Sequence, residues 1–150
     1  MEHIKQLLLD QIHKILDDKE ETAKEEIRSV KESLENENKC TVGDKHETGR
    51  ARLQAELDKN SIQLIKIERQ IVKLSAIDLH KEYNKAEFGS LVMTSLGNYF
   101  ISLAIGKISV EGEDYYCISL ASPIGELLFQ KKPGDTFIFQ GKEVQIINIF

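Results

Sequence analysis

The stretch Val42-Gly43-Asp44-Lys45-His46-Glu47-Thr48-Gly49 decides the fold that the sequence predicts. It holds the only two glycines of the first 88 residues, and long, charged, heptad-patterned segments flank it on both sides. Two helical segments that meet at a short glycine-bearing bend favour an antiparallel hairpin with this stretch at its tip. Asp44 and Glu47 then lie where the second helix begins, at the far end of the hairpin.

The segment before the bend predicts a helix that starts within the first few residues and runs to about Glu37. Charged residues between its apolar positions are placed for pairs three or four residues apart on an exposed face. Glu20 interrupts the apolar row, which is close to a heptad spacing and consists of Leu8, Ile12, Ile15, Leu16, Ala23, Ile27, Val30 and Leu34.

The segment after the bend has the more regular pattern. Its apolar row alternates steps of four and three residues, as in a coiled-coil seam, through Leu53, Leu57, Asn60, Leu64, Ile67, Ile71 and Leu74. Asn60 in this row favours one register at some cost in stability. A parallel dimer between two chains would leave the glycine-bearing bend unexplained, so the pattern favours a hairpin within one chain.

The composition changes abruptly along the chain. Residues 1–86 carry 34 of the 45 charged residues, whereas all ten aromatic residues lie from Tyr83 onward, with seven of the nine glycines. We therefore expect two domains with a boundary near residues 84–88. Residues 1–84 form the coiled-coil hairpin, with an acidic tip near residues 40–49, and residues 85–150 form a second domain.

The second domain is predicted to be a small β-sheet with one short helix, which makes the fold class α+β. Ser122 and Pro123 predict the start of that helix, with serine as the N-cap and proline at the first helical position. Pro133-Gly134-Asp135 predicts a turn. The last two strands are expected to join through Gly141-Lys142, with glycine first. The six expected strands cover residues 91–95, 99–105, 107–110, 115–120, 136–140 and 143–149.

The overall composition excludes several classes of protein. With a net charge of −5, the chain lacks the excess of basic residues that is typical of a protein that binds nucleic acid by itself. The apolar runs are too short to span a bilayer, and the first residues lack the pattern of a signal peptide. Cys40 and Cys117 have no disulfide-framework spacing, which fits a reducing environment. The expectation is a cytoplasmic protein without a membrane contact.

Two motifs stand in fixed order on these two architectures. The first is Gly43-Asp44-x-x-Glu47, and the second is Ser122-Pro123-Ile124-Gly125-x-Leu127-Leu128-x-x-Lys131-Lys132-x-Gly134-Asp135. Together they resemble the Gre family of bacterial transcription elongation (transcript-cleavage) factors, the GreA/GreB-like proteins, over nearly the whole chain. The second motif is the specific part of the resemblance, because a bare Asp-x-x-Glu has little meaning alone.

The resemblance implies a partner, RNA polymerase, and a role for each domain. The second domain would be FKBP-like and would dock at the rim of the polymerase secondary channel. The coiled coil would enter that channel, where Asp44 and Glu47 help to hold a second Mg²⁺ that activates water to cut the 3′ end of backtracked RNA. The chain would then be a monomeric accessory factor rather than an enzyme. It would bind no cofactor alone and would meet RNA only through the polymerase. The docking residues implied are Ser122, Pro123, Ile124, Gly125, Lys131 and Lys132.

Elementary chemistry agrees with this role for the tip. Hydrolysis of a phosphodiester by two metals requires a second cation, and Mg²⁺ prefers carboxylate oxygens. The spacing of Asp44 and Glu47 places both on one side of a helix. Since the partial positive charge of a helix N-terminus opposes cation binding, the pair is predicted to be a poor metal site until the polymerase adds ligands.

The tip also departs from the family pattern. Lys45 and His46 lie between the two carboxylates, and Thr48-Gly49-Arg50 replaces a more acidic continuation. Added positive charge weakens cation affinity by direct repulsion. An alternative function is therefore a Gre-like channel-binding regulator that inhibits or modulates transcription without promoting cleavage.

Four further interpretations stand beside these. Asp44 and Glu47 also fit a capping box, with Asp44 as the N-cap. A transition-metal site that adds Cys40 and His46 matches no standard zinc spacing. A prolyl isomerase or chaperone needs an aromatic-lined pocket, and the chain has no tryptophan. A purely structural coiled coil is the remaining alternative.

Overall fold

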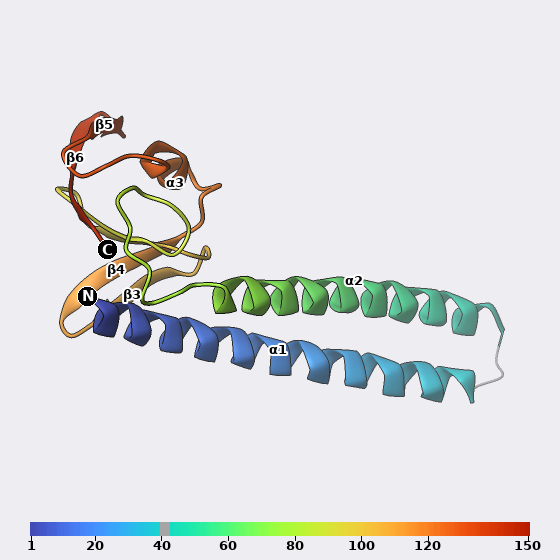
Figure 1. Ribbon diagram of the computed structural model, residues 1–150. Coiled ribbons are helices and arrows are strands. Elements are labelled where there is room, and N and C mark those ends of the chain that lie inside the picture. The colour runs from blue at the N-terminus through green and yellow to red at the C-terminus, as the bar shows by residue number, and fades with distance from the viewer. Residues whose placement is uncertain (40–42) are drawn as a thin grey trace. The chain divides into compact units, whose positions relative to one another are not determined.

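The computed structural model describes the backbone of residues 1–39 and 43–150, and the side chains of residues 1–39 and 47–150. The chain forms a long helix α1 (Glu2–Asn38), a second long helix α2 (Gly43–Ser75), and then six strands with one short helix α3 (Pro123–Leu128). This order confirms the α+β class, with a helical hairpin first and a small sheet with one short helix second (Figure 1).

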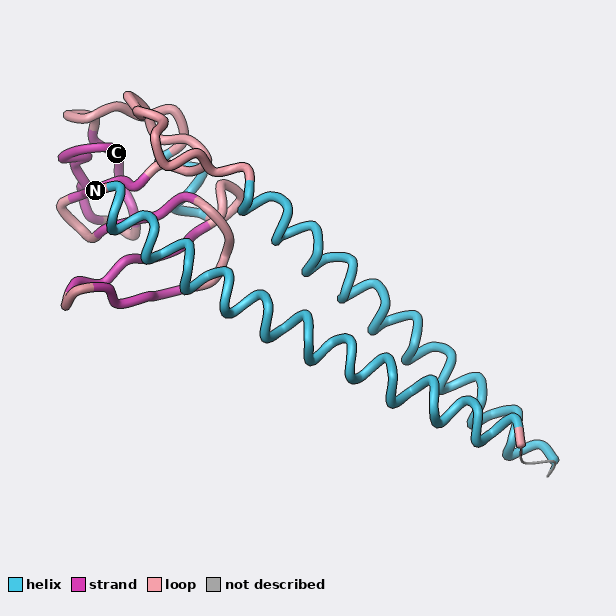
Figure 2. The backbone as a smooth tube through the Cα atoms, turned by 60° about the horizontal axis from the view of Figure 1, so that its bottom comes forward, coloured by secondary structure: helices cyan, strands magenta, loops and turns pink. Residues whose placement is uncertain are grey.

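The helices α1 and α2 run side by side in opposite directions (Figures 1 and 2). The predicted seam of α2 is confirmed, because all seven of its positions are half-buried or buried and Ile67 is only 3% exposed. On α1 the seam residues Leu16, Ala23 and Val30 are buried. Glu20 is tolerated in the seam because it pairs with the Lys24 ammonium at 2.9 Å.

The chain packs as two compact units. One consists of residues 14–72, and the other of residues 1–13 together with residues 73–150. The first thirteen residues therefore share a unit with the sheet. Contacts within that unit include a His3 Nε2–Glu111 Oε1 distance of 3.1 Å and a hydrogen bond from Lys5 Nζ to the main-chain oxygen of Phe150.

The six strands form a sheet in the order β3-β4-β2-β1-β6-β5. All neighbours are antiparallel except β2 and β4, which are parallel. A parallel pair requires a crossover, and here β3 lies in the connection between β2 and β4. The strands are β1 (Leu91–Thr94), β2 (Asn98–Ile101), β3 (Gly106–Val110), β4 (Glu113–Ile118), β5 (Thr136–Phe139) and β6 (Lys142–Ile149).

The turn of the last hairpin differs from the expectation. The two residues between β5 and β6 are Gln140 and Gly141, both with positive φ (49° and 76°), and Lys142 is the first residue of β6. The predicted Gly141-Lys142 turn is therefore wrong by one residue. A two-residue turn with positive φ at both positions matches the twist of the flanking strands, and glycine suits its second position.

The sheet unit has a core of alternating strand residues covered by α3. On β1 and β2, both of two consecutive residues are fully buried (Leu91 and Val92, Phe100 and Ile101), so both faces of these strands are covered. The core cluster of the sheet unit contains Tyr83, Ala86, Val92, Tyr99, Ile101, Ile124, Leu128, Phe137, Val144, Ile146 and Ile149.

Candidate functional sites

The acidic tip lies at the start of α2. This helix begins at Gly43, so Asp44 stands inside the helix. The capping-box interpretation required Asp44 to stand directly before the first helical residue. Glu47 follows Asp44 by three positions, and its side chain is exposed. Arg50 is exposed one turn further along. The side chains of Asp44, Lys45 and His46 lie outside the described residues.

A hollow of about 550 Å³ lies between the helices next to this tip. Gly49 helps to form it, because a Cβ there would come within 3.3 Å of Glu37 Oε1. The lining residues are Ser33, Asn36, Glu37, Gly49, Arg52, Leu53 and Glu56.

The described side chains do not assemble a metal site. Within residues 1–39 and 47–150, no group of three or more His, Cys, Asp or Glu side chains is placed to hold an ion. Glu47 contributes one exposed carboxylate, and Cys40, like Asp44 and His46, falls outside this range. Any role of Glu47 toward a cation would need ligands from elsewhere.

In the second motif, Ser122 has the predicted capping role. It is the N-cap of α3, with Pro123 as the first helical residue. Its Oγ accepts a hydrogen bond from the Gly125 main-chain nitrogen at 3.1 Å and donates one to the Ser119 carbonyl oxygen at 2.7 Å. These bonds satisfy one free N–H of the first helical turn and anchor it to the preceding segment.

Gly125 and Gly134 are also explained by the fold. A Cβ at Gly125 would lie 2.1 Å from the Ser119 carbonyl oxygen, so no other residue fits without a shift. Gly134 has φ of +92°, which favours glycine. Asp135 closes the same turn by accepting a hydrogen bond at 2.8 Å from the main-chain nitrogen of Lys132. Much of the motif therefore serves folding.

The implied docking residues differ in their exposure to solvent. Pro123 and Lys132 are exposed and Ser122 and Lys131 are half-buried, while Ile124 and Gly125 are buried. Within the described part of the chain, neither lysine has an ion pair. Phe129, at the end of α3, is a large exposed hydrophobic residue next to them. Lysines beside an exposed aromatic residue form a surface suited to a partner that carries negative charge and an apolar contact.

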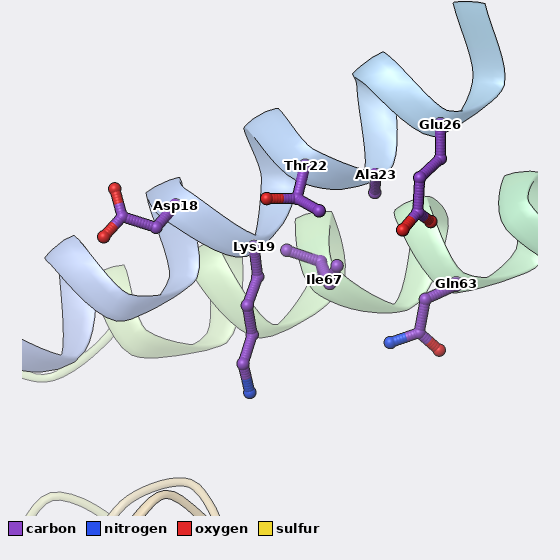
Figure 3. A pocket seen from close by; sticks show the side chains of 7 residues that line it. All are labelled: Asp18, Lys19, Thr22, Ala23, Glu26, Gln63 and Ile67. Atoms are coloured by element: carbon purple, nitrogen blue, oxygen red, sulfur yellow. The ribbon is translucent and has the colours of Figure 1, made fainter. Parts of the chain in front are cut away.

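A second hollow, of about 380 Å³, lies along the hairpin seam (Figure 3). Ala23 fills less of the seam than a leucine or isoleucine would, which leaves space opposite Ile67. The carboxylates of Asp18 and Glu26 lie at its two ends, and Gln63 borders it from α2 (Figure 3). The described lining holds no nucleophile with an adjacent base, so the hollow has no evident chemistry.

The sheet unit contains a buried lysine that sequence reasoning missed. Lys5 is 2% exposed, and its Nζ lies 4.3 Å from the centre of the Tyr83 ring and 3.4 Å from the main-chain oxygen of Phe150. Burial lowers the pKa of Lys5 to about 8, against the opposing effect of the Asp78 and Glu2 charges. Lys5 lies seven residues before Ile12, and this heptad spacing was the signal in the sequence that could have predicted the burial of Lys5.

These observations define the protein as an α+β protein with a helical hairpin, an exposed glutamate near the start of the second helix, and a lysine-bearing turn on its sheet unit. No protein-family model matches the sequence, and no curated protein matches it. Among the described residues, no helix is both long enough and apolar enough to cross a membrane. The function is therefore argued from the motifs and their placement.

Proposed function

We propose that this protein is a Gre-like accessory factor that enters the secondary channel of RNA polymerase and stimulates cleavage of backtracked RNA. The observation that supports it most is the placement of the two motifs. Asp44 and Glu47 stand at the start of α2, at the end of a hairpin of two helices with 37 and 33 residues. The second motif follows on a small sheet domain, which we propose to be FKBP-like and to dock on the polymerase in the cytoplasm.

The chemistry asked of the tip is limited. Asp44 and Glu47 would supply carboxylate oxygens and the polymerase the remaining ligands of a second Mg²⁺, and such an ion would activate water for hydrolysis. The N-terminal end of α2 carries a partial positive charge that disfavours a cation. The tip would therefore contribute only inside the polymerase active site, and the factor would have no nuclease activity alone.

The test is a transcript-cleavage assay on backtracked elongation complexes of the cognate polymerase at limiting Mg²⁺. We expect shortened RNA with the wild type and no shortening with the Asp44→Ala/Glu47→Ala variant. Glu56→Ala, an exposed glutamate of the same helix away from its start, is the matched control and should retain stimulation. Retained stimulation in the double variant would contradict the proposed mechanism.

A second candidate is a channel-binding regulator that slows or modulates transcription without cleavage. Arg50 favours it, because this residue is exposed three positions after Glu47 and thus on the same side of α2. Its positive charge, with Lys45 and His46, opposes a cation at the tip. In the same assay, slowed extension without shortening would support this candidate. Arg50→Ala should then weaken the inhibition.

A further inference from the structure

A second heptad row runs along α2 on its solvent-exposed side. We call it the outer row. Its spacing alternates steps of three and four residues, as the seam does. All six of its members are exposed: Ala55, Asp58, Ile62, Ile65, Arg69 and Val72.

Three branched aliphatic residues of the outer row are exposed to solvent. Ile62, Ile65 and Val72 are 69%, 48% and 72% exposed. Branched aliphatic residues repeated at heptad spacing form helix–helix interfaces, and such a row on an exposed face indicates a surface that another helix covers.

The two charged residues of the row lack partners in their own helix. No residue of opposite charge stands three or four positions from Asp58 or Arg69. Asp58 accepts a hydrogen bond from Gln54 Nε2 at 3.0 Å, which leaves its charge uncompensated. The two residues are eleven positions apart, roughly 16 Å along a helix, so they do not meet within one chain.

The outer row is complementary to itself when two copies run antiparallel. With a two-fold axis between Gln63 and Leu64, each Ile62 lies opposite Ile65 of the second copy, and the same rotation places Asp58 opposite Arg69 and Ala55 opposite Val72. A parallel pair in register would instead place Asp58 against Asp58 and Arg69 against Arg69.

We infer that the outer row of α2 is a self-pairing surface, through which two copies of this chain form an antiparallel homodimer. The inference goes beyond the proposed function and does not depend on it. Where that function holds, the pairing would compete with it, because a hairpin covered by a second copy is wider than the one that enters a channel.

The flanking charges set the strength of this dimer. Lysine and arginine residues recur every seven positions beside the outer row, at Arg52, Lys59, Lys66 and Lys73. In the antiparallel pair Lys59 approaches Lys66 of the second copy, and exposed like charges repel. The dimer is therefore weak at low salt, where the monomer expected from the sequence dominates. Salt screens the Asp58–Arg69 attraction as well, but the like-charge approaches, Lys59 with Lys66 and Arg52 with Lys73, outnumber that pair, so salt should strengthen the dimer on balance.

The experiment measures the mass of the full chain by sedimentation equilibrium across concentration and salt. The wild type should shift from monomer toward dimer as either is raised. Asp58→Arg and Arg69→Asp should each raise the dissociation constant at least tenfold. An equimolar mixture of these two variants should dimerise again, because each altered residue then faces an opposite charge. Glu56→Ala, which lies on α2 outside the row, should behave as the wild type.

Circular dichroism confirms that each variant keeps its helices, so that a loss of dimer is not a loss of fold. A wild type that stays monomeric at every concentration and salt would overturn the inference. This is also the result expected if a helix of another protein, and not a second copy, covers the outer row. Single variants that dimerise as well as the wild type would also overturn it. Because no polymerase is present, either outcome is independent of the cleavage assay.

Discussion

Replacing Lys5 by methionine tests the energetic effect of the buried lysine of the sheet unit. Its amine is almost fully buried, and burial lowers the pKa of Lys5 from 10.5 to about 8. This difference in pKa lowers the free energy of unfolding by about 3 kcal/mol at pH 7, where the buried amine stays protonated. Methionine has a similar shape and no charge. It also lacks the hydrogen bond to Phe150, worth about 1 kcal/mol, and the attraction of the amine to the Tyr83 ring, worth about 1 kcal/mol while the amine is protonated.

The dependence on pH follows from proton binding. Between pH 8 and 10.5 the unfolded chain holds a proton on Lys5 that the folded chain has released, so the free energy of unfolding rises with pH. This gain in the free energy of unfolding is complete above pH 10.5 and is lost as the pH falls through 8. It amounts to about 2 kcal/mol between pH 7 and 9.5. The Lys5→Met variant should be more stable than the wild type by about 1 kcal/mol at pH 7, and this advantage should disappear by pH 9.5.

The assay is urea unfolding at several pH values between 7 and 9.5, followed by near-ultraviolet circular dichroism. All ten aromatic residues lie from Tyr83 onward, in the same compact unit as Lys5, so this signal reports on the relevant unit. The exposed Lys142 provides the control, because Lys142→Met should leave the pH dependence unchanged. Parallel stability profiles for the wild type and Lys5→Met would refute the argument.

Two further substitutions test the packing. Gly125→Ala should destabilise the sheet unit by about 1–3 kcal/mol, because the new Cβ meets the Ser119 carbonyl oxygen; Gly97→Ala, where a Cβ makes only ordinary contacts, is the control for the thermal midpoints. On α2, Ile67→Ala in the seam should cost about 2–4 kcal/mol in urea unfolding, whereas Ile62→Ala on the outer row should cost under about 0.5 kcal/mol at concentrations where the protein is monomeric. Equal costs at the two isoleucines would contradict the assignment of the seam.

Local patterns in the sequence were sufficient for the kinds of secondary structure and for much of their placement. The heptad row predicted the buried face of α2, and Ser122 with Pro123 predicted the start of α3. The turn between the last strands was misplaced by one residue, because Gln140 adopts positive φ there without being glycine. The strand order was not predicted, because strand pairing depends on long-range packing, which local periodicity does not encode.

At the candidate sites, the sequence alone suggested which residues would carry the proposed chemistry: the carboxylates of Asp44 and Glu47, and the second motif with Lys131 and Lys132. Only the tertiary structure separated the motif residues that serve folding from those that face solvent, because capping, close backbone approach and positive φ are properties of coordinates. It also decided that Lys5 is buried. An amphipathic helix pattern says which side chains share a face, but only packing decides which face is covered.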